Sequence, residues 1–255
     1  MSRERSFPVD RRRFLVAAAC LAVSGCQPLS DRQWVRRMIG VAEWANLRVH
    51  RALISRDKLA PEYGEQDISR RFRVNGSDNG ADELYQAHAR RGFVDWQLEV
   101  GGLVERPAKL SLGELRALPS RTQITRHDCV EGWSCIGKWK GVRLGALLQH
   151  VGLRPNARYI AFHCADRLQE SGPNYYESID FVDAFHPQTI LAYEMNDRAL
   201  PIAHGAPLRL RVERQLGYKM AKFVMRIEAV ETFAHLGDGK GGYWEDRGYD
   251  WYAGI

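Results

Sequence analysis

From about residue 96 onward, the 255-residue chain consists mainly of short β-rich runs separated by turn residues, and this pattern limits the folds that it can adopt. Strands are predicted at residues 96–100, 159–162, 189–193, 208–212 and 223–230. Short helices are predicted between them, because residues 111–114 have the spacing of a capping box and an apolar stretch at 144–151 stops at Gly152. Together these elements predict an α+β fold with mixed β-sheets, short helices and long loops.

Hydropathy and charge exclude two classes of protein. No apolar run reaches the roughly 18 residues of a membrane-spanning helix, which excludes an integral membrane protein. The formal charge is +6, but half of it comes from residues 1–13, where five arginines stand against two acidic residues. The charge that remains is too small over the rest of the chain to indicate a nucleic-acid partner.

Residues 1–25 have the organisation of a signal peptide, with a basic stretch followed by the uncharged apolar residues 14–25. Arg11 and Arg12, two residues before Phe14-Leu15, resemble the twin-arginine export motif, and Val23-Ser24-Gly25-Cys26 resembles a lipobox. We therefore expect export to the periplasm, with either a lipid anchor at Cys26 or plain cleavage nearby. The twin-arginine route carries folded proteins, so the motif also favours a cofactor inserted before export.

Residues 26–66 are predicted to form an N-terminal helical arm, and residues 67–255 the main domain. Within the arm, apolar residues of the segment 31–55 recur at steps of three and four, which predicts an amphipathic helix. We expect its apolar face to pack on the domain. The Asn-, Gly-, Ser- and Asp-rich composition of residues 71–82 predicts a long loop.

Three of the five cysteines, Cys129, Cys135 and Cys164, lie in the predicted domain. An odd number cannot pair completely, so at least one thiol is free or binds a ligand. The residues leave open a disulfide between Cys129 and Cys135, or a buried inert thiol. A zinc or copper site is a further alternative, from His127, Cys129, His163 and Cys164.

A basic cluster near the C-terminus predicts an anion pocket. Three alternating apolar residues within 208–212 point toward the core, which places Arg209 and Arg211 on the opposite face of their strand. A glycine turn then returns Lys219 and Lys222 toward the same place. Several cations and backbone amides at a turn are suited to a phosphate group. The alternative is a solvated basic strand edge.

Two segments carry a resemblance to a known family. The first is Met195-Asn-Asp-Arg-Ala-Leu-Pro201, continued by His204-Gly-Ala-Pro-Leu-Arg209 and by Gly217-Tyr-Lys219 to Lys222. The second is Cys129-Val-Glu-Gly-Trp133. Over residues 75–229 the chain resembles the sulfite oxidase superfamily of molybdopterin enzymes, in which these are the pterin-phosphate segment and the molybdenum-ligand segment. Asp197 replaces the glycine usual at that turn.

The resemblance implies a sulfite-oxidase-type fold and a Mo-molybdopterin cofactor with one molybdenum on a pterin dithiolene. It implies that the Cys129 thiolate is the metal ligand, since a soft sulfur donor suits this metal. Glu131 and Trp133 would be further catalytic residues, on the substrate side of the same loop. The implied cofactor-binding residues are Asn75, Cys164, His204, Arg209, Lys219 and Lys222.

The same resemblance implies an oxidoreductase that transfers an oxygen atom or two electrons to or from a small-molecule substrate. The surroundings of Cys129 are most similar to the periplasmic methionine sulfoxide reductase catalytic subunit, which favours reduction of an S- or N-oxide by a monomeric catalytic subunit. Electrons would then come from a membrane haem b protein. Arg73-Val-Asn75-Gly departs from the Arg-Asn-His segment of sulfite oxidation. A sulfite dehydrogenase and a non-catalytic periplasmic lipoprotein that binds through thiols or a metal are the alternatives.

Overall fold

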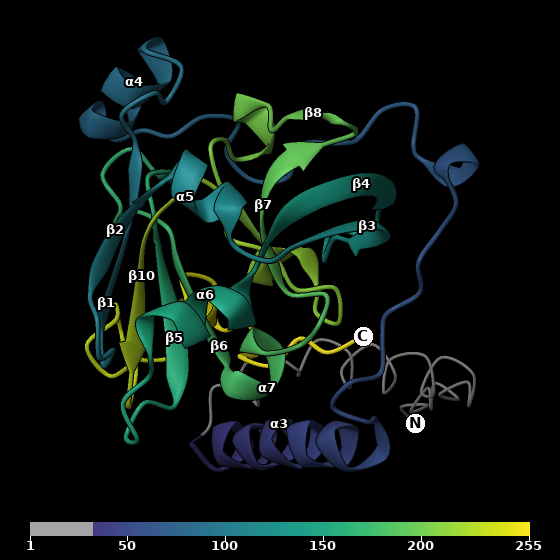
Figure 1. The fold of residues 1–255 in the computed structure, drawn as a ribbon. Helices are drawn as coiled ribbons and strands as arrows, with labels where there is room; N and C mark the ends of the chain where they lie inside the picture. The colour runs from purple at the N-terminus through teal and green to yellow at the C-terminus, as the bar shows by residue number, and fades with distance from the viewer. Residues whose placement is uncertain (1–32) are drawn as a thin grey trace, which may run out of the picture. The chain divides into compact units, whose positions relative to one another are not determined.

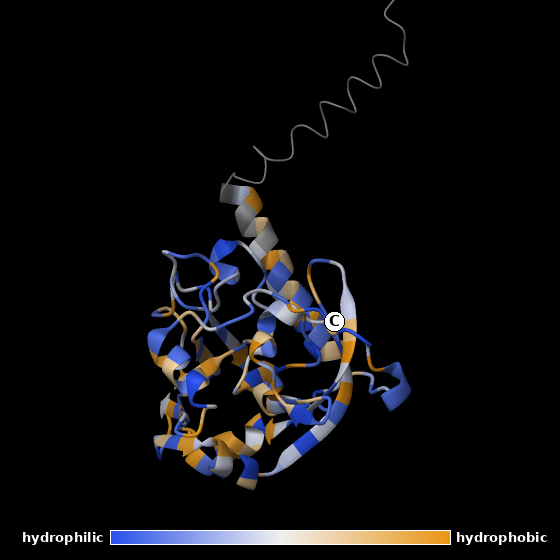
Figure 2. Ribbon diagram, turned by 90° about the horizontal axis from the view of Figure 1, so that it is seen from above, coloured by the Kyte–Doolittle hydropathy of each residue, from blue (hydrophilic) through white to orange (hydrophobic). Residues whose placement is uncertain are grey.

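A computed structural model describes residues 33–255, and the chain divides after Leu53 into two units that are considered separately. The predicted signal peptide 1–25 and Cys26 lie outside the described residues. The described part of the first unit is one helix, α3 (Gln33–Leu53), which confirms the predicted amphipathic helix. Trp34 and Met38 on its apolar face are exposed, and the packing of the arm on the domain stays a prediction. Hydrophobic and hydrophilic residues are interleaved along it (Figure 2).

The second unit is built around two five-stranded sheets (Figure 1). In the first sheet the strand order is β2-β1-β10-β5-β6, and in the second it is β3-β4-β7-β8, with β9 also paired to β7. The pairing of β1 with β10 is parallel and the other pairings are antiparallel. The predicted α+β fold with mixed sheets is therefore confirmed.

The strands are β1 (Gln97–Gly102), β2 (Ala108–Ser111), β3 (Ser120–Asp128), β4 (Ser134–Arg143), β5 (Tyr159–Cys164), β6 (Tyr176–Asp180), β7 (Ile190–Met195), β8 (Arg198–Ala199), β9 (Arg209–Arg211) and β10 (Val224–Val230). The helices of this unit are α4 (Glu83–Arg90), α5 (Leu112–Ala117), α6 (Leu144–Val151) and α7 (Phe181–Ala184). Four 3₁₀ turns complete it: η1 (Glu65–Asp67), η2 (Ile202–His204), η3 (Gly217–Lys219) and η4 (Glu245–Arg247). None of the described helices is long and apolar enough to cross a membrane.

The local signals read from the sequence explain where two helices begin and end. The Ser111 hydroxyl accepts from the amide of Glu114 at 3.2 Å, and the Glu114 carboxylate accepts from the amide of Ser111 at 2.8 Å, which is the predicted capping box of α5. Helix α6 buries its leucines in the main core and ends at Gly152, whose φ of 70° favours glycine. Both helices pack near β4.

The hairpin of β3 and β4 was not predicted from the sequence. The reason is that β3 turns polar side chains inward: Gln123, Thr125 and His127 are buried at the alternate positions where apolar residues would indicate a strand. The Gln123 amide donates to the carbonyl of Gln188 at 3.0 Å and to the Glu213 carboxylate at 2.8 Å. Buried polar groups with such partners are stable in a core but invisible to apolar periodicity.

Candidate active site

The turn between β3 and β4 carries the segment from Cys129 to Trp133. The amide of Cys129 donates to the carbonyl of Trp133 at 2.9 Å, and the amide of Gly132 donates to the carbonyl of Cys129 at 3.0 Å. Cys129 is half-buried, and this burial raises the pKa of its thiol. The hairpin thus fixes the direction of one thiol at the edge of its sheet.

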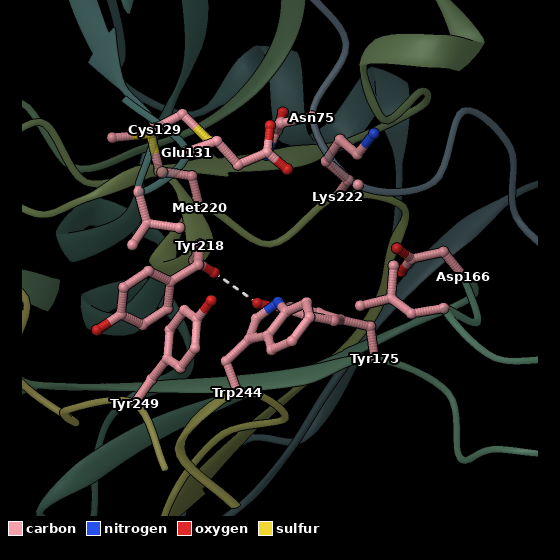
Figure 3. Close-up of a pocket in the computed structure, with 14 residues that line it drawn as sticks. Asn75, Cys129, Glu131, Asp166, Tyr175, Tyr218, Met220, Lys222, Trp244 and Tyr249 are labelled. Carbon is pink, nitrogen blue, oxygen red and sulfur yellow. Dashed lines mark hydrogen bonds between the residues drawn. The ribbon is translucent and has the colours of Figure 1, made fainter. Parts of the chain in front are cut away.

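Cys129 faces a cavity of about 130 Å³ that segments distant in the sequence enclose (Figure 3). In this view the sulfur-bearing side chains Cys129 and Met220 lie on one side of the cavity, and Lys222 lies on the opposite side. An aromatic wall, formed by Tyr218, Trp244 and Tyr249, closes the lower part of the view. The other lining residues are Asn75, Gly76, Val130, Glu131, Asp166, Leu168, Tyr175 and Gly217.

The aromatic wall is held by contacts among its own members. The rings of Trp244 and Tyr249 are stacked with their centroids 5.1 Å apart, and Tyr218 meets Tyr249 edge-on at 5.2 Å. The Tyr175 hydroxyl donates to the carbonyl of Tyr218 at 2.5 Å (Figure 3). A rigid apolar wall beside a thiol suits a substrate with apolar substituents.

Trp133 holds Glu131 in place. Its indole Nε1 donates to Glu131 Oε2 at 2.9 Å, while its ring lies 5.5 Å from the ring of His127 and 5.3 Å from the Arg73 guanidinium. The structure therefore places Glu131 in the cavity lining and Trp133 behind it as a positioning residue.

Strand β9 alternates as predicted, but both of its faces are buried. Arg209 and Arg211 have no exposed surface and lie with their guanidinium carbons 5.0 Å and 4.5 Å from the ring centroid of Trp139. The alternative of a solvated basic strand edge is therefore wrong. Trp139 belongs to β4, whose packing against the arginine face excludes the water that the sequence pattern led us to consider.

Two of the four cations of the basic cluster are neutralised inside the protein. The Arg211 guanidinium forms a two-pronged pair with Glu213, with Nη2–Oε2 at 2.6 Å and Nε–Oε1 at 2.9 Å. The Lys219 ammonium contacts the carboxylates of Glu177 and Glu245, all of them buried. Burial lowers the pKa of Lys219, but these two carboxylates outweigh it, so the pKa is raised overall.

The other two cations have no such partner among the described residues. Arg209 donates from Nη1 to the carbonyl of His204 at 3.1 Å, while its Nε and Nη2 have no protein acceptor in the described chain. The Lys222 ammonium donates to the carbonyls of Ser77 and Ala203. Burial and the nearby charge of Arg211 lower the pKa of Arg209 to about 9, and burial and Arg209 lower that of Lys222 to about 7. The fold holds two buried cations that an external anion would stabilise.

Further buried polar atoms near these cations lack a protein partner in the described part of the chain. They are Asn75 Oδ1, Asp166 Oδ1, His204 Nδ1 and His127 Nε2. Asp166 Oδ2 accepts from the Ser77 hydroxyl at 2.6 Å, and burial raises the pKa of Asp166 to about 6. Burial and the charge of Arg209 lower the pKa of His204 to about 4. Orphaned acceptors and donors in one region indicate a bound molecule that supplies both kinds of group.

The other two thiols of the domain, Cys135 and Cys164, do not line the cavity, and a contact of Cys164 with the cofactor stays a prediction. Cys129, Cys135 and Cys164 are free, so the disulfide alternative is wrong. No group of three or more His, Cys, Asp or Glu that could hold a metal occurs within residues 33–255. Cys164 is buried at the end of β5, where burial raises the pKa of its thiol well above the ordinary value, and its amide donates to the carbonyl of Tyr175.

Comparison with known families decides what this arrangement belongs to. The profile described as "Oxidoreductase molybdopterin binding domain" matches residues 86–235, which include Cys129 and the whole basic cluster. The chain belongs to this family. It is a molybdopterin-dependent oxidoreductase of the sulfite oxidase type, as the resemblance implied.

Relatives of known name agree with the family. A protein of Azospira oryzae, provisionally named protein-methionine-sulfoxide reductase subunit YedZ1, is 38% identical over 248 residues, covering 96% of this chain and 87% of the relative. The protein-methionine-sulfoxide reductase catalytic subunit MsrP of Ralstonia nicotianae is 32% identical over 235 residues, covering 87% and 69%. The sulfane dehydrogenase SoxCD of Paracoccus pantotrophus matches with a TM-score of 0.49 and 24% identity, and the match covers 55% of this chain and 39% of that one.

The residues present fit a molybdopterin cofactor. A pterin offers ring N–H groups to the orphaned oxygen of Asn75, and its phosphate offers oxygens to the free donors of Arg209. The backbone of Gly217 packs tightly against the ring of His127, because a Cβ at position 217 would lie 2.4 Å from Nε2 of His127. The Cys129 thiol and the Lys222 ammonium thus line one cavity, and Arg209 is a further buried cation whose Nε and Nη2 have no acceptor among the described residues.

Sequence reasoning missed Asp166, Met220 and the aromatic wall. The wall had a visible signal, since five aromatic residues stand between positions 243 and 252. Asp166 had none, because a single acidic residue after a strand is ordinary, and its buried place depends on the loop that carries Ser77.

Proposed function

We propose that this protein is the periplasmic catalytic subunit of a reductase that removes the oxygen atom from S-oxides, with methionine sulfoxide as the first candidate substrate. The names of the relatives from Azospira oryzae and Ralstonia nicotianae support this choice. The balanced reaction is R₂SO + 2 H⁺ + 2 e⁻ → R₂S + H₂O. When bound, molybdenum supplies the two-electron couple for oxygen transfer.

Cys129 Sγ would hold the molybdenum. The thiol is neutral in the free protein, because burial raises its pKa, and binding to the metal releases the proton. Arg209 and Lys222 would hold the pterin phosphate, with His204 beside it, and Asn75 would accept from the pterin. Lys219 is assigned to the fold instead, since its charge is taken up by Glu177 and Glu245.

The aromatic wall is the reason for proposing a sulfoxide as the substrate rather than sulfite. Tyr218, Trp244 and Tyr249 present apolar surface to the cavity, and sulfur next to an aromatic ring is a favourable contact. A sulfoxide is neutral and has two carbon substituents, so it matches this wall. Sulfite is a dianion and would meet the Glu131 carboxylate at the same cavity. The wall thus favours the reductase over the sulfite dehydrogenase.

Asp166 is suited to hold one of the protons that the reaction consumes. Its pKa of about 6 keeps Oδ1 partly protonated near neutral pH, and Oδ2 is fixed by the Ser77 hydroxyl. Trp133 keeps the Glu131 carboxylate at the cavity, where it orients polar groups of the substrate.

Electrons would come from a separate partner, a membrane haem b protein, and the word "subunit" in the names of the relatives supports such a partner. Export by a twin-arginine route, lipidation at Cys26 and the periplasmic location rest on residues 1–26 and belong to the same proposal.

The test uses the purified, molybdenum-loaded protein with an artificial electron carrier. Rates of reduction with free methionine sulfoxide and with a peptide containing it are compared with rates of sulfite oxidation by the oxidised carrier. We expect reduction of the sulfoxides and little sulfite turnover. Faster sulfite oxidation would establish the alternative enzyme, and a purified protein without molybdenum or pterin would favour the non-catalytic lipoprotein.

A further inference from the structure

The helix α3 exposes a continuous apolar stripe that the proposed function does not use. Trp34, Met38, Val41 and Val49 follow one another at helical steps, and each has more than half of its surface exposed, from 52% at Val49 to 66% at Val41. Large exposed apolar patches on a soluble domain mark an interaction surface.

The composition of the helix gives it a net positive charge. The helix sequence contains four arginines and one acidic residue, Glu43. The Arg48 guanidinium lies 4.7 Å from the ring centroid of Trp44, and both residues are exposed, so this cation rests on an aromatic ring at the margin of the apolar face. Tryptophan and arginine at such a margin are typical of helices that lie in a membrane interface.

The geometry points to α3 as an amphipathic helix that lies on an anionic lipid surface, with the stripe of Trp34, Met38, Val41 and Val49 inserted between headgroups. The excess of arginine over acidic residues complements the charge of such a surface. The helix is too polar to span, in agreement with the finding on the described helices. This inference does not depend on the reductase activity or on lipidation of Cys26.

Chain length is consistent with the placement. Six residues lie between Cys26 and Gln33, and the seven steps from one to the other reach at most about 25 Å when fully extended. A chain held at the membrane by any anchor near Cys26 would therefore keep the first turn of α3 close to the interface. Since a single acyl chain binds a membrane only marginally, a second attachment is physically useful.

The test measures co-sedimentation of the full-length holoenzyme carrying Cys26→Ser, which removes lipidation, with protein-free vesicles. One set of vesicles contains phosphatidylglycerol and phosphatidylethanolamine, and the other contains phosphatidylcholine alone. We expect binding to the anionic vesicles, weaker binding to the neutral ones, and a loss of binding in about 1 M NaCl, where the Debye length is about 3 Å.

Val41→Glu and Asn46→Glu form a matched pair, because each adds one carboxylate at an exposed position of the same helix. Val41→Glu is expected to reduce vesicle affinity by about tenfold or more, and Asn46→Glu by clearly less. Circular dichroism and turnover of methionine sulfoxide should be unchanged in both variants, which separates this inference from the proposed function.

Three outcomes would overturn it. The first is a Cys26→Ser protein that does not bind anionic vesicles, and the second is an equal effect of the two substitutions. The third is binding only to membranes that contain a partner protein, which would assign the stripe to a protein–protein interface.

Discussion

A substitution of Cys129 should affect turnover and pterin binding differently. The thiol is the proposed metal ligand, while the anion site is built from other residues, so Cys129→Ser is expected to abolish turnover and leave most of the pterin bound. A serine hydroxyl is a harder donor and remains protonated at neutral pH. Molybdenum content, pterin content and sulfoxide turnover are measured on the same preparation.

Cys135→Ser is the matched control for that experiment. Cys135 is half-buried, and its sulfur contacts the carbonyl of Arg71 and the amide of Arg73, contacts that a hydroxyl also makes. The variant should keep turnover near that of the unchanged protein. Activity retained in Cys129→Ser would remove Cys129 from the metal.

Two of the buried cations, Arg209 and Lys222, are expected to bind the pterin phosphate, and the other two, Arg211 and Lys219, to stabilise the fold. Arg209→Met and Lys222→Met each remove a charge-assisted hydrogen bond of about 1.5–3 kcal/mol, which corresponds to roughly ten- to hundredfold in affinity for the pterin. Pterin content is measured after expression in limiting molybdate, because slow release hides a weaker site in protein already loaded.

Lys219→Met serves as the contrasting variant. It leaves Glu177 and Glu245 buried without their cation, so we expect the free energy of unfolding of the cofactor-free protein to fall by about 3–5 kcal/mol. If Lys219→Met lowered pterin content with unchanged stability while Lys222→Met did neither, the division would be wrong.

Anion binding is expected to depend on pH through Lys222. Its pKa of about 7 in the free protein reflects burial and the charge of Arg209. A bound dianion raises this pKa, so binding takes up a proton above pH 7 and none well below it. Affinity for sulfate, which stays a dianion, should be greatest below about pH 7 and fall by up to about tenfold per pH unit above it.

Calorimetric titration of cofactor-free protein with sulfate measures this dependence. Lys222→Met should weaken binding and flatten the profile. An unchanged slope in that variant would assign the dependence to another group, and a flat profile in the unchanged protein would contradict the linkage.

A buried ion pair at the end of β9 is hydrogen-bonded to β3. Arg211 pairs with Glu213, and Glu213 also accepts from Gln123 of β3. Glu213→Gln leaves a buried guanidinium without its charge partner, and we expect a loss of about 3–5 kcal/mol in the free energy of unfolding.

The double variant Arg211→Met/Glu213→Leu removes both charges together. It should be less destabilised than Glu213→Gln, because no unpaired charge remains in the core. Denaturant unfolding of the cofactor-free proteins compares the two. An equal loss in the free energy of unfolding for the double variant and for Glu213→Gln would show that the pair contributes through packing and not through charge.

For the whole molecule, the expected order of events is folding, cofactor insertion and then export. Replacing Arg11 and Arg12 by lysine should leave cofactor-loaded protein in the cytoplasm, since the twin-arginine motif is read by a receptor and not by its charge alone. The control replaces Arg3 and Arg5 by lysine, outside the motif. Cells are fractionated, and the protein and its molybdenum are measured in the cytoplasmic and periplasmic fractions. Export of the Arg11 and Arg12 variant at the normal level would contradict the proposed route.

Sequence reasoning reached the class of fold and the thiol because both depend on short-range patterns. The strands β1, β5, β7, β9 and β10 and the ends of α5 and α6 were predicted, since periodicity, capping and glycine punctuation act over a few residues. The motif around Cys129 led to the family, which the profile match confirmed. The roles of the individual site residues remain predictions.

Long-range packing determined the rest. Periodicity places Arg209 and Arg211 on one face, but only the contact with Trp139 of β4, in the same sheet, shows that this face is dry. Arg211 and Lys219 form buried ion pairs, whereas Arg209 and Lys222 do not. The partner of Arg211 is Glu213, two residues along the chain, but the partners of Lys219 are Glu177 and Glu245, which are distant in the sequence. Side chains of one charge look alike in a sequence, and their pKa values and partners are set by burial and by neighbours that the fold alone brings together.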